Sequence, residues 1–419
     1  MYKINWKKEL AWTVKIGWSK NAVLPIIAAS LLIKWKVILT NVPEIGDVYT
    51  FLDIIKWIWV KTKFENHILE LDSTELKETD FDLEKMKKIR VSILLLAPLL
   101  DRLWKISIPT PGGCNLGKRP IDDHIKWLEN IWYKAEINFE SIDLKWKTIS
   151  GDMEVNAGFW VTVTENLLVA NVLRKGTTTI RLAAIEPHVM NLVDFLRSAW
   201  ANISIRYDHT IIVEWVEELK WNFEFEVVSD YIQSGSYMVI WALCSKEYID
   251  IENARIKDLF FFIQKLKEIW VKIKDLWNDK LRVYKSTNLR ATNIQTNIFP
   301  GFPTDLQSPF ALLMTQAEWI SKIHEILFEW RLGWLVELEK MGLNMKILNP
   351  HEAEITGLVD FKATTVTSWD LRAGCAVAIA GLMATWETTV TNIEYIKRGY
   401  EDFVENLQML WADIKEVEE

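Results

Sequence analysis

The chain repeats one pattern six times, and this repetition constrains the fold more than any other feature. Each copy has an apolar stretch, a small turn, a short strand rich in β-branched residues, a second turn, a helix and a closing strand. The copies begin near Ala29, Leu95, Leu168, Val239, Leu312 and Ile379. A spacing of roughly 65 to 75 residues is too long for a solenoid repeat and indicates a strand–helix unit used six times. The sequence therefore predicts an α/β fold.

Two turns of the repeat alternate between tryptophan and glycine. Glycine suits a turn because it reaches positive φ without steric cost, whereas tryptophan is bulky and favours burial. The closing turns carry Trp59, Trp132, Trp200, Trp270, Gly342 and Trp411. The turns before the opening strand carry, in five copies, Trp35, Trp104, Gly176, Trp319 and Trp386. The chain has 23 tryptophans and only 16 glycines, although glycine usually makes up about 7% of a protein.

We therefore interpret most of the tryptophan positions as glycine in the native protein. A stop codon reassigned to glycine, and read as tryptophan in the written sequence, would produce this pattern. A side chain forced into a left-handed turn costs roughly 1–2 kcal/mol. Ten or more such sites would cancel a typical stability of about 5–15 kcal/mol. The alternative is a tryptophan-rich protein, and mass spectrometry of the native chain at Trp59 and Trp411 distinguishes the two.

Composition limits the class of protein. The net charge of −8 argues against nucleic acid as a partner. The longest apolar run, residues 373–384, is too short to span a bilayer and predicts a buried helix, so no membrane partner is expected. The first residues lack the apolar core of a signal peptide, and three cysteines give no disulfide framework, so we expect a cytoplasmic protein. The six histidines are scattered without metal-ligand spacing, and we expect no metal and no cofactor.

The length of 419 residues exceeds the usual size of a single core, so two domains are expected. Helical stripes and β-branched strands alternate throughout the chain, and no low-complexity linker divides it. Six repeats split naturally into three and three. We expect a first domain at residues 21–229 and a second domain at residues 1–20 and 230–419. The sequence does not predict an oligomeric state.

The segment 111–120 is the sharpest candidate for chemistry. Two glycines precede Cys114, and Lys118 and Arg119 follow it. Basic neighbours favour the reactive thiolate and attract anions. A lone cysteine is usually a small core residue, but a basic loop rich in glycine and proline favours a reactive one. Cys244 and Cys375 lie in apolar runs and fit the core interpretation.

Other candidates are weaker when each is taken alone. Lys20 and Asn21 follow a turn at the start of a predicted helix, which suits an anion, although a capping turn has the same pattern. Asp305 follows a proline turn, where aspartate is usually a turn former or a helix cap. Four arginines next to apolar sequence could join Lys20 and Arg119 in binding a multiply charged anion. They are Arg90, Arg331, Arg372 and Arg398.

Taken together, these segments resemble the UDP-N-acetylglucosamine enolpyruvyl transferases over nearly the whole chain. The matching motifs are 19–25, 41–43 with 47–48, 111–120, 302–307, 328–331, 370–374 and 398–400. The resemblance implies a two-domain inside-out α/β barrel with three strand–helix repeats per domain. It also implies an active site in the cleft between the domains, which closes when the sugar nucleotide binds.

The resemblance also implies a reaction. The family transfers the enolpyruvyl group of phosphoenolpyruvate to the 3′-hydroxyl of UDP-N-acetylglucosamine and releases phosphate, the first committed step of peptidoglycan synthesis. By resemblance, Cys114 is the general acid and the target of fosfomycin, and Asp305 is the base that meets the sugar hydroxyl. The substrate-binding positions implied in the same way are Lys20, Asn21, Arg90, Arg119, Arg331, Arg372 and Arg398.

Two alternatives stay open at this point. The shikimate-pathway enolpyruvyl transferase has the same fold and also uses phosphoenolpyruvate, but the Cys114 loop and segment 370–374 favour the sugar-nucleotide enzyme. The repeats could also form a binding scaffold without catalysis. One segment departs from the family, because its lysine and serine are replaced by Asn156 and Gly158 in a loop that contacts the nucleotide.

Overall fold

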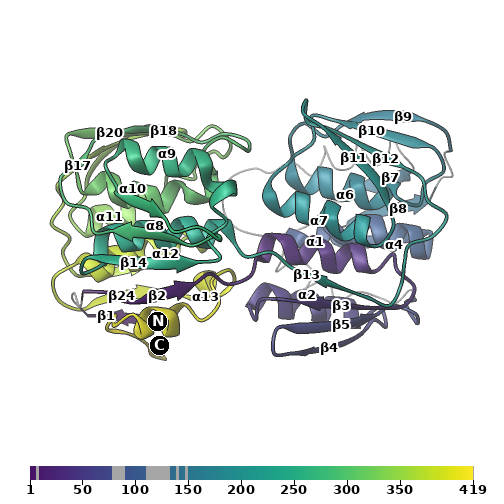
Figure 1. Ribbon diagram of the computed structural model, residues 1–419, viewed down its shortest axis with the longest axis horizontal. Coiled ribbons are helices and arrows are strands. Elements are labelled where there is room, and N and C mark those ends of the chain that lie inside the picture. The colour runs from purple at the N-terminus through teal and green to yellow at the C-terminus, as the bar shows by residue number, and fades with distance from the viewer. Residues whose placement is uncertain (6–8, 78–89, 110–132, 138–140, 147–149, 419) are drawn as a thin grey trace. The chain divides into compact units, whose positions relative to one another are not determined.

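The structure is a computed structural model, and it describes residues 1–5, 9–77, 90–109, 133–137, 141–146 and 150–418. These residues form two compact units (Figure 1). The first unit holds the described residues from 18 to 228. The second unit holds the described residues of 1–17 and 229–418. Each unit has its own hydrophobic core.

The first unit alternates helices with short strands, as the repeat predicts. In Figure 1 its strands lie at the edges and its helices between them. Its helices are α1 (Lys20–Ser30), α2 (Gly46–Lys56), η1 (Arg90–Leu95), α4 (Leu96–Leu103), α6 (Val161–Asn171) and α7 (Pro187–Ser198). Its strands are β3 (Lys36–Thr40), β4 (Lys61–Glu65), β5 (Ile68–Asp72), β6 (Lys105–Pro109), β7 (Tyr133–Ile137), β8 (Ser141–Trp146), β9 (Met153–Asn156), β10 (Thr177–Arg181), β11 (Asn202–Arg206), β12 (Thr210–Glu214) and β13 (Phe223–Glu226).

Three sheets enclose the helices of the first unit. Their strand orders are β13-β3-β5-β4, β6-β8-β7 and β11-β12-β10-β9. Hairpin pairs run antiparallel, with Thr62 of β4 opposite Leu71 of β5. The strand before a central helix pairs in parallel with the strand after it, as β9 does with β10 on either side of α6. Such a pairing is the βαβ crossover expected from alternating strands and helices.

The second unit repeats this plan. Its helices are α8 (Tyr231–Cys244), η2 (Ile256–Leu259), α9 (Phe260–Glu268), η3 (Thr304–Leu306), α10 (Gln307–Thr315), α11 (Leu335–Lys340), α12 (Leu371–Met383), α13 (Glu394–Lys397) and α14 (Phe403–Met409). Its strands are β1 (Tyr2–Ile4), β2 (Thr13–Lys15), β14 (Tyr248–Glu252), β15 (Ile273–Asp275), β16 (Leu281–Tyr284), β17 (Leu289–Arg290), β18 (Asn293–Gln295), β19 (Ala317–Glu318), β20 (Ile320–His324), β21 (Asn344–Asn349), β22 (Glu352–Thr356), β23 (Thr365–Thr367), β24 (Thr388–Thr391) and β25 (Ile414–Glu416).

Three four-stranded sheets and one small pair build the second unit. The orders are β15-β16-β14-β2, β18-β20-β22-β21, β23-β24-β1-β25 and β17-β19. Three central helices, α8, α10 and α12, pack against one another among these sheets. They are apolar on almost every face, which is the pattern of a helix buried on all sides. The apolar run predicted as a buried helix is α12. Every helix in the described part of the chain is too short or too polar to cross a bilayer.

Among the residues that the structure describes, ten tryptophans have left-handed backbone, the conformation that glycine adopts easily. They are Trp12, Trp59, Trp104, Trp200, Trp270, Trp277, Trp319, Trp330, Trp386 and Trp411, with φ between 64° and 92°. Each of the two aligned sets of turns has one glycine, and both glycines also have positive φ: 114° at Gly176 and 104° at Gly342. Trp35 is an exception, and Trp132 lies outside the described residues.

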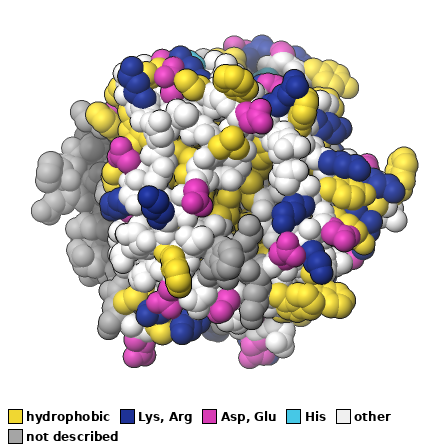
Figure 2. All heavy atoms as spheres, turned by 90° about the vertical axis from the view of Figure 1, so that its left-hand side faces the viewer, with side chains coloured by type: hydrophobic (Ala, Val, Ile, Leu, Met, Phe, Trp, Pro, Cys, Tyr) yellow, Lys and Arg dark blue, Asp and Glu magenta, His cyan; other side chains and the backbone are white. Residues whose placement is uncertain are grey.

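These ten side chains also gain little burial. Trp386 is 82% exposed and Trp319 is 79% exposed, whereas Trp241 inside α8 is fully buried. Figure 2 shows hydrophobic side chains, some alone and some in groups, exposed among charged ones on the face that it draws. Tryptophan therefore meets a steric cost at these turns without the burial that normally favours it. This observation supports the interpretation that these positions are glycine in the native protein.

Candidate active site

Three of the predicted site residues meet in the second unit. Asp305 lies in η3, directly after the Pro303 turn. Its Oδ1 accepts a hydrogen bond from Nη2 of Arg331 at 2.8 Å, and its Oδ2 accepts one from Nε of Arg372 at 3.3 Å. The two arginine side chains are almost fully buried, while the Asp305 side chain keeps 29% of its surface exposed. The carboxylate is therefore held from behind by two cations and stays accessible to a ligand.

Arg331 comes from the turn that follows β20. Its Nη1 donates to the hydroxyl of Thr304 at 2.8 Å, so the guanidinium contacts two successive residues of η3. Burial alone lowers the pKa of Arg331, but the charges of Asp305, Asp370 and Glu325 outweigh burial and raise it. Arg331 thus remains a cation inside the unit, and it fixes the direction in which Asp305 points.

Arg372 lies in the first turn of α12 and is 1% exposed. The helix is capped by Asp370, which accepts the backbone N–H groups of Arg372 and Ala373. The guanidinium lies 5.1 Å from the centre of the Tyr400 ring and 3.9 Å from the Asp230 carboxylate. Among the described residues, its Nη1 and Nη2 have no hydrogen-bond partner. Buried N–H groups are normally hydrogen-bonded, so these two nitrogens are suited to an anionic ligand.

The sequence did not indicate Asp230 or Tyr400 as site residues. Asp230 caps α8 by accepting the N–H groups of Ile232 and Gln233, and its backbone N–H donates to Gly17. Burial raises the pKa of Asp230, although Arg372 acts in the opposite direction. An aspartate before an apolar helix has the pattern of an ordinary cap. Its approach to Arg372 is a tertiary contact that no local pattern reveals.

The first unit places Lys20 and Asn21 at the start of α1. Ser19 caps this helix by accepting the backbone N–H of Ala22. Lys20 is 9% exposed, and its Nζ lies 2.6 Å from Oδ2 of Asp47, which belongs to the first turn of α2. The ion pair holds the ammonium group at the joint start of two helices, where partial positive charge also favours anions.

The structure tells less about the remaining predicted residues. Arg90 begins η1, and only its backbone is described. Arg398 follows α13, is partly buried, and donates its backbone N–H to Glu394. Cys114 and Arg119 lie outside the described residues. Within the described ranges, no cluster of His, Cys, Asp or Glu could hold a metal ion.

The second-unit cluster has a definite chemical capacity. Two buried arginines can bind phosphate or carboxylate through bidentate hydrogen bonds. A carboxylate beside them, exposed on one edge, can accept a proton from a bound hydroxyl. Fixed cations next to such a group also stabilise negative charge that develops during a reaction. The arrangement therefore fits a group transfer that involves an anionic substrate and a hydroxyl acceptor.

Comparisons with known proteins give the family. The family model described as EPSP synthase (3-phosphoshikimate 1-carboxyvinyltransferase) matches residues 4–407. UDP-N-acetylglucosamine 1-carboxyvinyltransferase 1 of Caldanaerobacter subterraneus is 37% identical over 405 residues, which is 97% of this chain and 96% of the relative. The enzyme of the same name from Halothermothrix orenii is 35% identical over 404 residues, 96% of each chain.

Solved structures give the fold. The enolpyruvyl transferase NikO from Streptomyces tendae superposes with a TM-score of 0.90 at 21% identity, over 99% of this chain and 98% of that one. EPSP synthase from Acinetobacter baumannii superposes with a TM-score of 0.72 at 15% identity, over the full length of both chains. The predicted fold, a two-domain enolpyruvyl transferase-like α/β barrel, is confirmed. By sequence, this chain belongs to the family of UDP-N-acetylglucosamine 1-carboxyvinyltransferases, within the wider EPSP synthase family.

Proposed function

We propose that this chain transfers the enolpyruvyl group of phosphoenolpyruvate to the 3′-hydroxyl of UDP-N-acetylglucosamine and releases phosphate. The observation that carries the proposal is the 37% identity to an enzyme named for this reaction, over 97% of this chain. The cluster of Asp305, Arg331 and Arg372 supports it, because the reaction needs cations for an anionic substrate and a base for a hydroxyl.

The proposed chemistry is addition followed by elimination. A proton adds to the methylene carbon of phosphoenolpyruvate, which makes C2 electrophilic. The sugar hydroxyl oxygen attacks C2 while Asp305 takes its proton. The new methyl group then loses a proton, the bond between C2 and the phosphate oxygen breaks, and phosphate leaves with the electron pair. Arg331 and Arg372 would stabilise the negative charge on the substrate through these steps.

The remaining parts of the proposal rest on the family motifs. Cys114 would be the general acid and the residue that fosfomycin modifies. Lys20, Arg119 and Arg398 would hold the phosphate and carboxylate of phosphoenolpyruvate, Asn21 the sugar, and Arg90 a substrate anion. The enzyme would act in the cytoplasm at the start of peptidoglycan synthesis, and so support cell-wall growth and division. We also propose that the two compact units correspond to the two three-repeat domains.

Phosphate release tests the proposal directly. The expected result is release from phosphoenolpyruvate that depends on UDP-N-acetylglucosamine, and that falls sharply in the Cys114→Ala and Asp305→Asn variants. Release with shikimate 3-phosphate alone would instead assign the shikimate-pathway reaction. Release that survives unchanged when both variants are combined would contradict the residue roles. No release from the unmutated protein, made with the native residue at each tryptophan position, would favour a binding scaffold.

A further inference from the structure

A buried carboxylate behind the cluster ties its parts together. Glu325 follows β20 and is fully buried. Its Oε1 accepts hydrogen bonds from the Thr296 hydroxyl at 2.8 Å and from the backbone N–H groups of Leu327 and Phe328 at 3.0 and 3.3 Å. Its Oε2 accepts the Thr304 hydroxyl at 2.7 Å. One side chain therefore joins the end of β18, the start of η3 and the turn that leads to Arg331.

The direction of these hydrogen bonds is fixed by chemistry. An arginine can only donate, and a hydroxyl has one proton. Because Thr304 donates its proton to Glu325, its oxygen can accept only, and it accepts from Nη1 of Arg331. Nη2 of the same guanidinium then donates to Asp305. A relay of hydrogen bonds therefore links Asp305 to Glu325 through Arg331 and Thr304, and Arg331 is the donor both to Asp305 and to Thr304.

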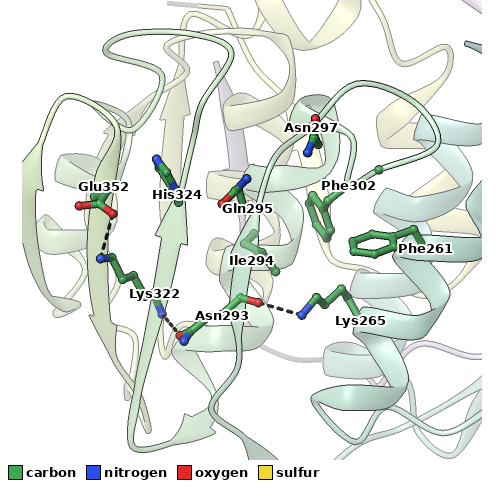
Figure 3. A pocket seen from close by; sticks show the side chains of 11 residues that line it. Phe261, Lys265, Asn293, Ile294, Gln295, Asn297, Phe302, Lys322, His324 and Glu352 are labelled. Carbon is green, nitrogen blue, oxygen red and sulfur yellow. Dashed lines mark hydrogen bonds and ion pairs between the residues drawn. The ribbon is translucent and has the colours of Figure 1, made fainter. Parts of the chain in front are cut away.

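The backbone around Glu325 is held as well. Its N–H donates to the carbonyl of His351 at 2.7 Å, and its own carbonyl lies 2.6 Å from Nδ1 of the same histidine. Thr296 is fully buried, and its hydroxyl accepts the backbone N–H of Ile326 at 3.1 Å. Its chain neighbours Gln295 and Asn297 face a pocket of about 440 Å³ on the surface (Figure 3). The carboxylate is thus anchored on the core face of this segment and does not line the pocket.

We propose that Glu325 is a positioning residue for the transfer reaction and acts on Asp305 through Thr304 and Arg331. The inference rests on the proposed function for its kinetic consequences, but the relay itself depends only on the contacts above. Without the acceptor at Glu325, the Thr304 hydroxyl can reorient, and Arg331 no longer has a fixed partner behind it. A base that is misplaced by about 1 Å can cost a reaction roughly 100-fold in rate.

Glu325→Gln tests the relay because it keeps the shape and replaces one acceptor oxygen with an NH₂ donor. We expect kcat to fall by about 10–100-fold, with a smaller change in KM for phosphoenolpyruvate. Glu325→Asp keeps both acceptor oxygens and should recover part of the loss. An unchanged kcat in Glu325→Gln would overturn the proposal.

A double-mutant cycle with Thr304→Val separates positioning from general stability. Valine removes the hydroxyl that links Arg331 to Glu325. If the relay operates through this hydroxyl, the double variant loses no more activity than the worse single variant. Fully additive losses would show that Glu325 acts through its other contacts, and would overturn the proposal.

Glu337→Gln is the matched control. Glu337 is also a buried carboxylate of the second unit, 3% exposed, and it accepts hydrogen bonds from Lys340, the backbone N–H of Thr367 and the Trp369 indole. None of its recorded hydrogen bonds in the described part of the chain reaches Arg331 or Asp305. We expect Glu337→Gln to lower the free energy of unfolding about as much as Glu325→Gln does. Its kcat per folded molecule should stay close to that of the unmutated protein.

A structural readout keeps this inference separate from the proposed function. If the unmutated protein releases no phosphate with either acceptor, the proposed function fails and the relay can still be examined in crystals of both variants. The distance from Nη2 of Arg331 to Oδ1 of Asp305 is 2.8 Å in this structure. Loss of this contact in Glu325→Gln but not in Glu337→Gln supports the relay, and its retention in both contradicts it.

Discussion

Tryptophan and left-handed backbone conflict at single positions of this chain. Trp386 has φ 76° and is 82% exposed, so its indole offsets little of the roughly 1–2 kcal/mol that a side chain costs there. Asparagine also occurs at several positive-φ turns, such as Asn41 and Asn288, where its short polar side chain is tolerated. Tryptophan has no such compensation, so glycine is the residue that these turns favour.

Trp386→Gly is therefore expected to stabilise the protein. In a chain that carries glycine at the other left-handed positions, the free energy of unfolding should rise by about 1–2 kcal/mol. Trp241→Gly is the control, because this indole is fully buried in α8 and its loss should destabilise by about 3–5 kcal/mol. Denaturant unfolding measures both changes. A decrease in stability for Trp386→Gly would contradict the assignment of glycine to that turn.

Arg372→Lys should strongly impair the reaction, although lysine keeps the positive charge of arginine. A lysine has no planar fork, so it cannot contact Asp305 and also present two N–H groups to an anion. We expect kcat for phosphate release to fall by about 100-fold or more. Arg282→Lys is the matched control, since Arg282 pairs with Asp250 on neighbouring strands. A rate for Arg372→Lys equal to that of this control would contradict a role for the guanidinium.

Most of the candidate site residues that the structure describes lie at the N-terminal ends of helices. Lys20 opens α1, Arg372 lies in the first turn of α12, and Asp230 caps α8, so the ends of buried helices bring charged groups to defined points. The sequence predicted α1 and α12 from apolar runs and predicted Lys20, Asp305, Arg331 and Arg372 from motifs. It could not predict Asp230, because one aspartate serves both as a cap and as a neighbour of Arg372. Contacts between elements far apart in sequence leave no local pattern.

The same limit explains why Glu325 and Tyr400 were not predicted. Glu325 follows a strand as many surface glutamates do, and only the approach of Thr296 and Thr304 from other segments makes it a buried acceptor. The Tyr400 ring lies beside the Arg372 guanidinium because α12 packs against α13, which ends shortly before Tyr400. The repeat predicted the alternation of strands and helices well, since it depends on local periodicity. The pairing of charges depends on the tertiary fold.

Glu165 on α6 gives a prediction at the scale of one helix. Burial, and next the nearby charge of Glu186, raise the pKa of Glu165 well above its ordinary value of 4.5. A carboxyl group whose pKa is raised in the folded state loses its proton more easily in the unfolded state. The free energy of unfolding therefore falls as the pH rises from 4.5 through the pKa of the folded state. Glu165→Gln should remove this fall, so that the variant becomes relatively more stable toward alkaline pH.

Denaturant unfolding from about pH 5 to about pH 8 measures the effect. Each unit of pKa shift corresponds to about 1.4 kcal/mol of differential stability at the alkaline end. Glu154→Gln is the control, because Glu154 is exposed on β9 in the same unit. Identical pH profiles for Glu165→Gln and the unmutated protein would show that this carboxyl group has no raised pKa.

The described chain passes from one unit to the other twice, each time between a strand and the helix that follows it. In α6, α10 and α12 the strand before the helix pairs in parallel with the strand after it. The strand before α1 is β2, yet it pairs with β14 of the second unit. The strand before α8 is β13, yet it pairs with β3 of the first unit. At both crossings the strand therefore stays in the sheet of the unit that the chain is leaving, while the helix that follows it belongs to the other unit.

The cost of tryptophan at left-handed turns acts on the whole molecule, because each of the six copies of the repeat has at least one such turn. Ten sites at roughly 1–2 kcal/mol each amount to about 10–20 kcal/mol, which is comparable to or larger than the usual stability of about 5–15 kcal/mol. A chain with glycine at all ten is expected to fold cooperatively, and a chain with tryptophan at all ten to be largely unfolded or insoluble. Soluble yield and denaturant unfolding of the two chains measure this difference. Intact-mass measurement of the native protein provides the independent check, since every glycine in place of tryptophan lowers the mass by a fixed amount. Equal stability of the two chains, or native peptides with tryptophan at residues 59 and 411, would mean that the protein tolerates indole side chains at glycine turns throughout its fold.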